Sequence, residues 1–124
     1  MPSGPLRAPN THHLTIALTS NYVREGVPKV LVVTATTVRQ TKVLDSTCIL
    51  NQGDHEFLKS ASFIVYAWAL ILDVSRIKKG FKSQGWRPMA PLERGVLERV
   101  VAGLQDSSRA PIKTKLFFYD WNHR

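Results

Sequence analysis

The stretch STCILNQGDHEFLKSASFIVY, from Ser46 to Tyr66, joins two apolar runs through a loop that carries Gly53, Asp54 and His55 in succession. Histidine suits proton transfer because its unperturbed pKa, about 6.5, lies near working pH. Asp54 stands beside it as a carboxylate, although adjacent side chains often point apart. The competing interpretation is structural: Asp54 bonds the loop's own N–H groups in an Asx-type turn. Both interpretations of His55 and Asp54 stay open at this stage.

A second group of candidates lies where a β-branched segment ends, at Thr36, Thr37 and Arg39. Arginine stays charged and can bind two phosphate oxygens at once, and threonine adds a hydroxyl donor. Cleaving a phosphodiester by acid–base catalysis requires a base for the proton of the attacking hydroxyl, an acid for the leaving oxygen and fixed positive charge at the phosphate. The candidates for these roles are His55, Asp54, Arg39 and Thr37 for catalysis, with Thr36 and Lys59 for contact with RNA.

The charge balance is the strongest signal in the composition. Seventeen Lys and Arg against nine Asp and Glu give a net charge of +8, which favours a polyanionic partner because neutralised phosphates release counterions. Between residues 76 and 87 the chain has cations, two aromatic residues and no acid. Cations beside stacking rings suit single-stranded nucleic acid, and the alternative is a solvated loop. The predicted RNA-binding residues here are Arg76, Lys78, Lys79, Lys82, Trp86 and Arg87.

Other chemistries find less support in the sequence. The single cysteine, Cys48, excludes an internal disulfide and a multi-cysteine zinc site, and its apolar neighbours indicate a small core residue. No HExxH or similar spacing is present, so we expect neither a metal nor a cofactor. No apolar run reaches the roughly 18 residues needed to cross a bilayer, and no signal peptide is evident. We therefore expect a cytoplasmic protein without a membrane partner.

The length of 124 residues predicts one domain, because two would each be too small to bury a stable core. Residues 1–13 hold three prolines and show no periodicity, which predicts a loose arm. Alternation then predicts a strand with Leu14, Ile16 and Leu18 on one face. The β-branched run from Lys29 predicts the central strand of a sheet.

Beyond the loop, the apolar run from Phe63 to Leu72 predicts a buried strand. A helix is predicted at about 91–105, where apolar residues recur at three- and four-residue steps: Leu92, Val96, Leu97, Val100, Val101 and Leu104. The alternation in IKTKLFFYDW predicts a final strand at 112–121. The predicted fold is therefore mainly β, a small barrel or strongly bent antiparallel sheet with one late packed helix.

The order of these segments resembles the MazF/PemK family of toxin ribonucleases. KVLVVTATT resembles the family's central strand, KSASFIVYAWALILDVSRI its following apolar segment, and APLERGVLERVVAGL its closing helix. The resemblance covers about Leu14 to Leu104. It implies an SH3-like barrel that forms a homodimer and cleaves single-stranded RNA without a metal, as part of a toxin–antitoxin system. It also carries the family's threonine onto Thr36 or Thr37.

This sequence departs from the family pattern in two places. The family's arginine has no clear counterpart, since His12 and His13 precede the first matching strand, and the family's opening strand is missing. Two further interpretations therefore stay open: a non-catalytic nucleic-acid-binding module, or a protein-interaction module, on the same barrel. An acidic antitoxin-like protein would suit the basic charge of the chain as a partner.

Overall fold

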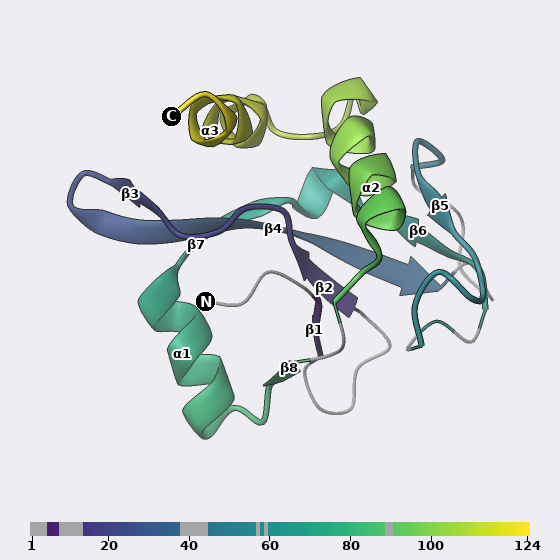
Figure 1. The fold of residues 1–124 in the computed structure, drawn as a ribbon, viewed down its shortest axis with the longest axis horizontal. Helices are drawn as coiled ribbons and strands as arrows, with labels where there is room; N and C mark the ends of the chain where they lie inside the picture. The colour runs from purple at the N-terminus through teal and green to yellow at the C-terminus, as the bar shows by residue number, and fades with distance from the viewer. Residues whose placement is uncertain (1–4, 8–13, 38–44, 57, 59, 89–90) are drawn as a thin grey trace.

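The computed structural model describes residues 5–7, 14–37, 45–56, 58, 60–88 and 91–124, with the backbone alone described at 5–7 and 87–88. One antiparallel sheet carries helices on both of its faces (Figure 1). The strands are β1 (Pro5–Arg7), β2 (Leu14–Ala17), β3 (Tyr22–Arg24), β4 (Val27–Thr37), β5 (Ile49–Leu50), β6 (Ser62–Ile64), β7 (Leu70–Asp73) and β8 (Arg87–Pro88). The helices are the 3₁₀ turn η1 (Tyr66–Trp68), α1 (Val74–Ser83), α2 (Arg94–Asp106) and α3 (Ile112–Asn122).

The main path of the sheet runs β5-β6-β4-β2-β1-β8, and β3 and β7 also pair with β4. The prediction of a mainly β fold is confirmed. Among the described strands, β5 and β8 end the path without pairing with each other, so the sheet is open and does not close into a barrel. None of the described helices is long and apolar enough to cross a membrane.

β4 organises the sheet because two strands pair along each of its edges. β3 and β2 share one edge, opposite residues 27–29 and 32–35, and β7 and β6 share the other, opposite residues 29–32 and 35–37. The β-branched residues of this strand suit a position with a neighbour on each side. The prediction of a central strand from Lys29 is therefore confirmed.

Alternate residues of β4 face two separate apolar clusters, as the period of two in a strand requires. Leu31 and Val33 face the larger cluster, which lies under α2 and α3 and includes Leu14, Ile16 and Leu18, the predicted inner face of β2. The smaller cluster lies under α1 and joins Val30 and Val32 of β4 to Ala17, Val74 and Ile77. The sheet thus carries a large core on one face and a small one on the other.

The prediction of one continuous strand from Phe63 to Leu72 is wrong. Both ends of this run do pair with β4, but the 3₁₀ turn η1 interrupts it. The Trp68 N–H donates to the Val65 carbonyl at 3.0 Å, and Trp68 itself is 48% exposed. A continuous apolar run does not reveal such a break, because its composition is the same on both sides.

The predicted late helix is confirmed as α2, which buries Val96, Val100 and Leu104. The predicted final strand at 112–121 is wrong, since α3 occupies it. Its buried residues Thr114, Phe117 and Phe118 follow helical spacing, which coincides with strand alternation over only a few residues. Pro111 precedes the helix, where its missing N–H costs nothing.

The expectation of a single helix is also wrong, because α1 forms as well. It buries Val74, Ile77 and Gly80 at three-residue steps, and Gly85 just beyond it has φ +71°, as is common after a helix end. Part of the predicted N-terminal arm is ordered too. Residues 5–7 form β1, which pairs with β2 on one side and β8 on the other.

Candidate nucleic-acid interface

The loop that contains Gly53, Asp54 and His55 is a tight turn after β5. The Asp54 N–H donates to the Asn51 carbonyl at 3.0 Å, and the Asp54 carboxylate accepts the Asn51 N–H at 2.7 Å. Gly53 has φ +102°, a backbone conformation in which a residue with a side chain would be strained. The carboxylate is therefore bonded to its own loop, as the structural interpretation of Asp54 predicted.

Arg99 of α2 holds this turn against the helix. Its guanidinium donates to the Ile49 carbonyl at 2.7 Å and lies 3.5 Å from the Asp54 carboxylate. Arg99 is not among the residues that the sequence predicts for a functional site. No sequence signal pairs this arginine with Asp54, because the two residues are 45 positions apart.

His55 is buried, with 6% of its surface exposed. Its carbonyl accepts the Leu58 N–H at 3.0 Å, and the residue takes part in a further polar or ring interaction. A general base must reach the proton that it abstracts. A catalytic role for His55 therefore requires the loop to open toward the substrate, and the assignment remains a prediction.

Thr36 and Thr37 end β4 beside β6, where they pair with Phe63 and Ser62. β5 is the next strand across, so these threonines lie about 10 Å from the start of the Asp54 turn. Alternation places the buried Thr36 side chain on the α1 side of the sheet and Thr37 on the side of α2 and Arg99. The other predicted residues of this group, Arg39 and Lys59, lie outside the described residues, as do His12 and His13.

Cys48 lies under α2 beside Tyr66 and confirms the prediction of a small core residue. Burial raises the pKa of the Cys48 thiol, which disfavours the nucleophilic thiolate. Burial also raises the pKa of Tyr66, so its hydroxyl stays protonated and donates to the Val100 carbonyl at 2.7 Å. Among the described residues, no three His, Cys, Asp or Glu side chains gather closely enough to hold a metal ion.

Four of the predicted RNA-binding cations lie on one helix, α1, and not on a loop. At about 100° per residue, they cover an arc of about 160° opposite the buried residues of the helix. The cationic arc, as we call it, consists of Arg76, Lys78, Lys79 and Lys82, all exposed. No ion pair joins any of the four to another described residue. Arg87 belongs to β8, and its side chain lies outside the described part of the chain.

Trp86 folds back onto α1 and contributes to packing as well as to the surface. A Cβ at Gly80 would lie 2.1 Å from its ring, so the indole sits directly against that glycine. The Arg76 guanidinium lies 4.8 Å from the ring centroid and donates to the Gln84 side chain at 2.7 Å. Trp86 is half-buried and forms a cation–π pair with one member of the cationic arc.

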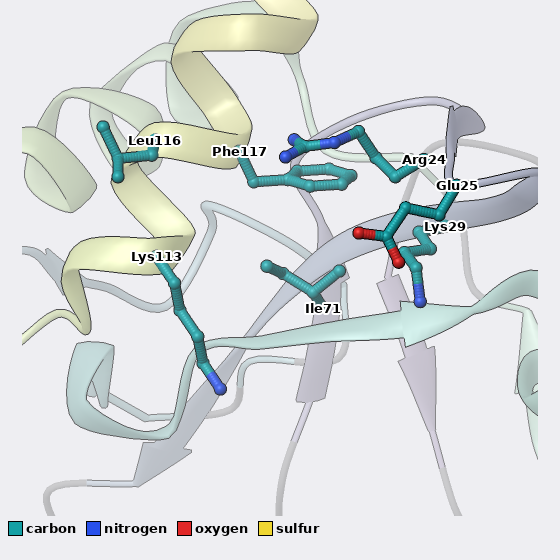
Figure 2. A pocket seen from close by; sticks show the side chains of 7 residues that line it. All are labelled: Arg24, Glu25, Lys29, Ile71, Lys113, Leu116 and Phe117. Atoms are coloured by element: carbon teal, nitrogen blue, oxygen red, sulfur yellow. The ribbon is translucent and has the colours of Figure 1, made fainter.

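One pocket, of about 360 Å³, opens between α3 and the β3–β4 hairpin (Figure 2). Ile71 and Phe117 line it together with the three cations Arg24, Lys29 and Lys113. Two of these cations are already compensated, because Arg24 pairs with Asp120 at 3.2 Å and Lys29 with Asp73 at 2.7 Å. Glu25 adds a carboxylate to the lining, so this pocket has little charge to offer an anion.

A second pocket, of about 260 Å³, lies on the other face of the sheet next to α1. Its floor consists of sheet residues Thr15, Val32, Thr34, Leu70 and Leu72, and Arg76 and Trp86 form its wall. No acidic residue lines it. We call it the α1 pocket, and it adjoins the cationic arc because both contain Arg76.

The predicted catalytic turn and the cationic arc lie at different ends of β4. α1 follows Asp73, which pairs with Lys29, whereas β6 pairs with β4 near Thr36. Seven residues of strand separate these two points, a distance of about 23 Å. In comparisons with protein-family models, curated proteins and solved structures, nothing matched this chain.

Proposed function

We propose that this protein binds single-stranded RNA along α1 and cleaves it as a metal-independent, toxin-like endoribonuclease. The observation that carries the binding half is the cationic arc, four exposed cations without an acidic partner among the described residues. Uncompensated cations gain the most from phosphates, because binding releases the counterions of the nucleic acid. The net charge of +8 extends the same attraction over the whole molecule.

The cleavage half draws its support from the sequence resemblance and from the arrangement of β4, β6 and β5. These neighbouring strands bring Thr37 close to the turn that carries Asp54 and His55. Arg99 adds a guanidinium to the same turn. In the proposed reaction, the 2′-oxygen attacks phosphorus while a base takes its proton, and the 5′-oxygen leaves with a proton from an acid. The products are a 2′,3′-cyclic phosphate and a 5′-hydroxyl.

Cleavage is tested by incubating the protein with a long single-stranded RNA in EDTA and mapping the ends of the fragments. We expect fragments with cyclic phosphate ends, and a loss of about 100-fold or more in rate for His55→Ala, since general acid–base catalysis contributes about that much. His123→Ala serves as the control, because that histidine is exposed near the end of α3. Intact RNA with the folded wild-type protein would remove the cleavage half of the proposal.

Binding is tested separately with a triple substitution of Lys78, Lys79 and Lys82 to Gln. The matched control replaces Arg94, Lys113 and Lys115, which removes the same charge from α2 and α3. For the α1 variant we expect the slope of log affinity against log salt to fall by about 2, since each phosphate contact contributes about 0.7 for a single strand. Equal effects of the two triple variants would mean that net charge, and not α1, attracts the RNA.

A second candidate function is a nucleic-acid-binding module without catalysis. It is favoured by the burial of His55 and by the bonding of Asp54 to Asn51 and Arg99. Under this function the salt-dependent binding persists, RNA stays intact, and His55→Ala leaves the affinity unchanged. Binding and cleavage assays on the same preparation separate the two candidates.

The proposal includes a homodimer and an acidic antitoxin-like protein as partner. Support comes from the resemblance and from the excess of 17 basic over nine acidic residues. Sedimentation at micromolar concentration tests the dimer, and a monomer there would remove that part. A pull-down from a nuclease-treated lysate tests the protein partner, because RNA-mediated contacts are lost under that treatment.

A further inference from the structure

The α1 pocket combines an apolar floor with two hydroxyl groups. Thr15 and Thr34 are directly opposite each other on β2 and β4, so their side chains lie about 5 Å apart on the same face. Neither hydroxyl has a hydrogen-bond partner among the described residues. Val32 and Leu70 are likewise opposite each other and provide the apolar part, and Leu70 is 52% exposed. A ligand that fits this floor needs a flat apolar body and a polar edge.

The wall of the pocket offers two flat surfaces of another kind. The Trp86 ring and the Arg76 guanidinium stand together at 4.8 Å, and both are surfaces on which nucleobases stack. Arg76 also belongs to the cationic arc, so a strand held along α1 passes the mouth of the pocket. The lack of acidic residues in the lining leaves this approach open to a polyanion.

We propose that the α1 pocket takes one unstacked nucleobase of the bound RNA strand. The base lies against the Trp86–Arg76 pair, its polar edge faces the hydroxyls of Thr15 and Thr34, and its phosphate lies on the cationic arc. This inference rests on the proposed RNA binding along α1 and adds a site that recognises a base, where the arc recognises only backbone. An amphipathic peptide would need anionic groups to match the same rim, whereas RNA brings both parts in every nucleotide.

The test compares RNA octamers of adenosine, cytidine or uridine with an abasic octamer that has the same ribose-phosphate backbone. The base pocket predicts that the best base-bearing octamer binds about 5- to 150-fold more tightly than the abasic one, the range expected for one stacked base. In a Trp68→Phe, Trp121→Phe background Trp86 is the sole tryptophan. Its fluorescence should then be quenched by base-bearing octamers and not by the abasic octamer.

Two variants locate the effect in the pocket. Leu70→Glu puts a carboxylate on its floor, and Leu116→Glu puts the same charge on α3, at 59% exposure against 52%. We expect Leu70→Glu to abolish the preference for bases and Leu116→Glu to retain it. Thr34→Val preserves the shape of the side chain and removes one hydroxyl, so it should weaken the binding of base-bearing octamers and not that of the abasic octamer. This variant keeps the test decisive even if Leu70→Glu fails to fold.

The outcomes separate this inference from the proposed function. Equal affinity for base-bearing and abasic octamers, with normal salt dependence, would overturn the base pocket and leave RNA binding standing. Equal losses in Leu70→Glu and Leu116→Glu would also overturn it, since long-range charge would then explain both. If no RNA binds at low salt, both proposals fail together.

Discussion

The sheet face under α2 and α3, which we call the closed face, is covered by two helices over the larger apolar cluster, apart from the pocket between α3 and the β3–β4 hairpin. The face under α1, which we call the open face, has one helix over the smaller cluster. On the closed face even the polar side chains are tied down: Tyr66 donates to Val100, and Arg99 holds the Asp54 turn. On the α1 face, cations, a tryptophan and two threonines remain accessible around a pocket. The same strands thus support one densely packed face and one face with accessible side chains.

This difference teaches that the location of candidate residues matters as much as their type. The predicted catalytic turn belongs to the closed face, where the Asp54 carboxylate already accepts the Asn51 N–H and lies against Arg99. The cationic arc and Trp86 belong to the open face, where ordering by a ligand remains possible. We therefore expect substitutions at the packed residues of the closed face to change mainly stability, and substitutions in the cationic arc and the α1 pocket to change mainly binding.

The largest effect should come from Gly103→Ala on the closed face. A Cβ at Gly103 would lie 2.0 Å from the Tyr66 hydroxyl oxygen and would displace it from the Val100 carbonyl. We expect the free energy of unfolding to fall by about 3 kcal/mol, since overpacking and the loss of a buried hydrogen bond act together. Gly95→Ala on the same helix meets nothing within 4 Å and should stabilise by about 1 kcal/mol. Urea denaturation of both variants measures the contrast.

The next largest effect on the free energy of unfolding should come from Asp45, and it should depend on pH. The Asp45 carboxylate accepts the Ser107 hydroxyl at 2.7 Å and the Thr47 N–H at 2.9 Å. Burial alone would raise the pKa of Asp45. The hydrogen bonds and the charge of Arg109 outweigh this effect and place the pKa below the usual 3.8. Since folding lowers this pKa, the stabilisation is present above about pH 3.8 and is lost as the pH falls through the folded-state value.

Asp45→Asn should therefore destabilise by about 2 kcal/mol at pH 7 and by less at pH 3. Denaturation curves at both pH values, for the variant and the wild type, provide the measurement. Ser46→Ala is the control, since that neighbour is exposed. A difference between Asp45→Asn and wild type that stays constant from pH 7 to pH 3 would contradict the assignment.

Gly80→Ala on the α1 face should lower the free energy of unfolding by less than Gly103→Ala does. Gly80→Ala places a Cβ 2.1 Å from the Trp86 ring, but this half-buried indole can move outward. We expect about 1 kcal/mol of destabilisation after the gain in helix propensity, with a red shift of Trp86 fluorescence in the Trp68→Phe, Trp121→Phe background. If Gly80→Ala destabilised as much as Gly103→Ala, the contrast between the two faces would be wrong.

The last effect, similar in size to that of Gly80→Ala, concerns Arg99. Arg99→Leu should cost about 1 kcal/mol, mainly through the lost bond to the Ile49 carbonyl, because the ion pair with Asp54 is partly exposed. Amide exchange at Asn51 and Asp54 should become faster as the turn loosens. Arg94→Leu is the matched control, since that side chain is 93% exposed and pairs with Glu98 one helical turn away. Equal exchange rates in the two variants would show that Arg99 does not hold the turn.

The central strand β4 and the late helix could be predicted from the sequence, because their patterns extend over many residues. Leu14, Ile16 and Leu18 on one side of β2, and Val96, Val100 and Leu104 on one side of α2, follow directly from hydrophobic spacing. The apolar residues of α3 satisfy both the strand period and the helix period over a short span, so the sequence favours a strand there. The sequence does not predict α1, because the buried side of this helix is narrow and glycine occupies part of it.

The sequence predicts which types of residue form the candidate sites, but it does not predict which of them lie in contact. The run of cations between residues 76 and 87 identified α1 as the charged element, although not as a helix. The partner of Asp54 and the pairing of Thr15 with Thr34 depend on tertiary contacts between distant segments. A single sequence carries no signal for such contacts, so neither Arg99 nor the α1 pocket could be inferred from it.

The pairing of β1 with β8 has a consequence for synthesis on the ribosome. Leu6 meets Pro88, about 80 residues further along the chain. At about 5–20 residues per second, the outer edge of β1 waits about 4–16 s for its partner to emerge. During this delay its backbone N–H and C=O groups can pair with another nascent chain. The border of the sheet is consequently assembled late, and slow elongation on crowded polysomes favours exchange of β8 between neighbouring molecules.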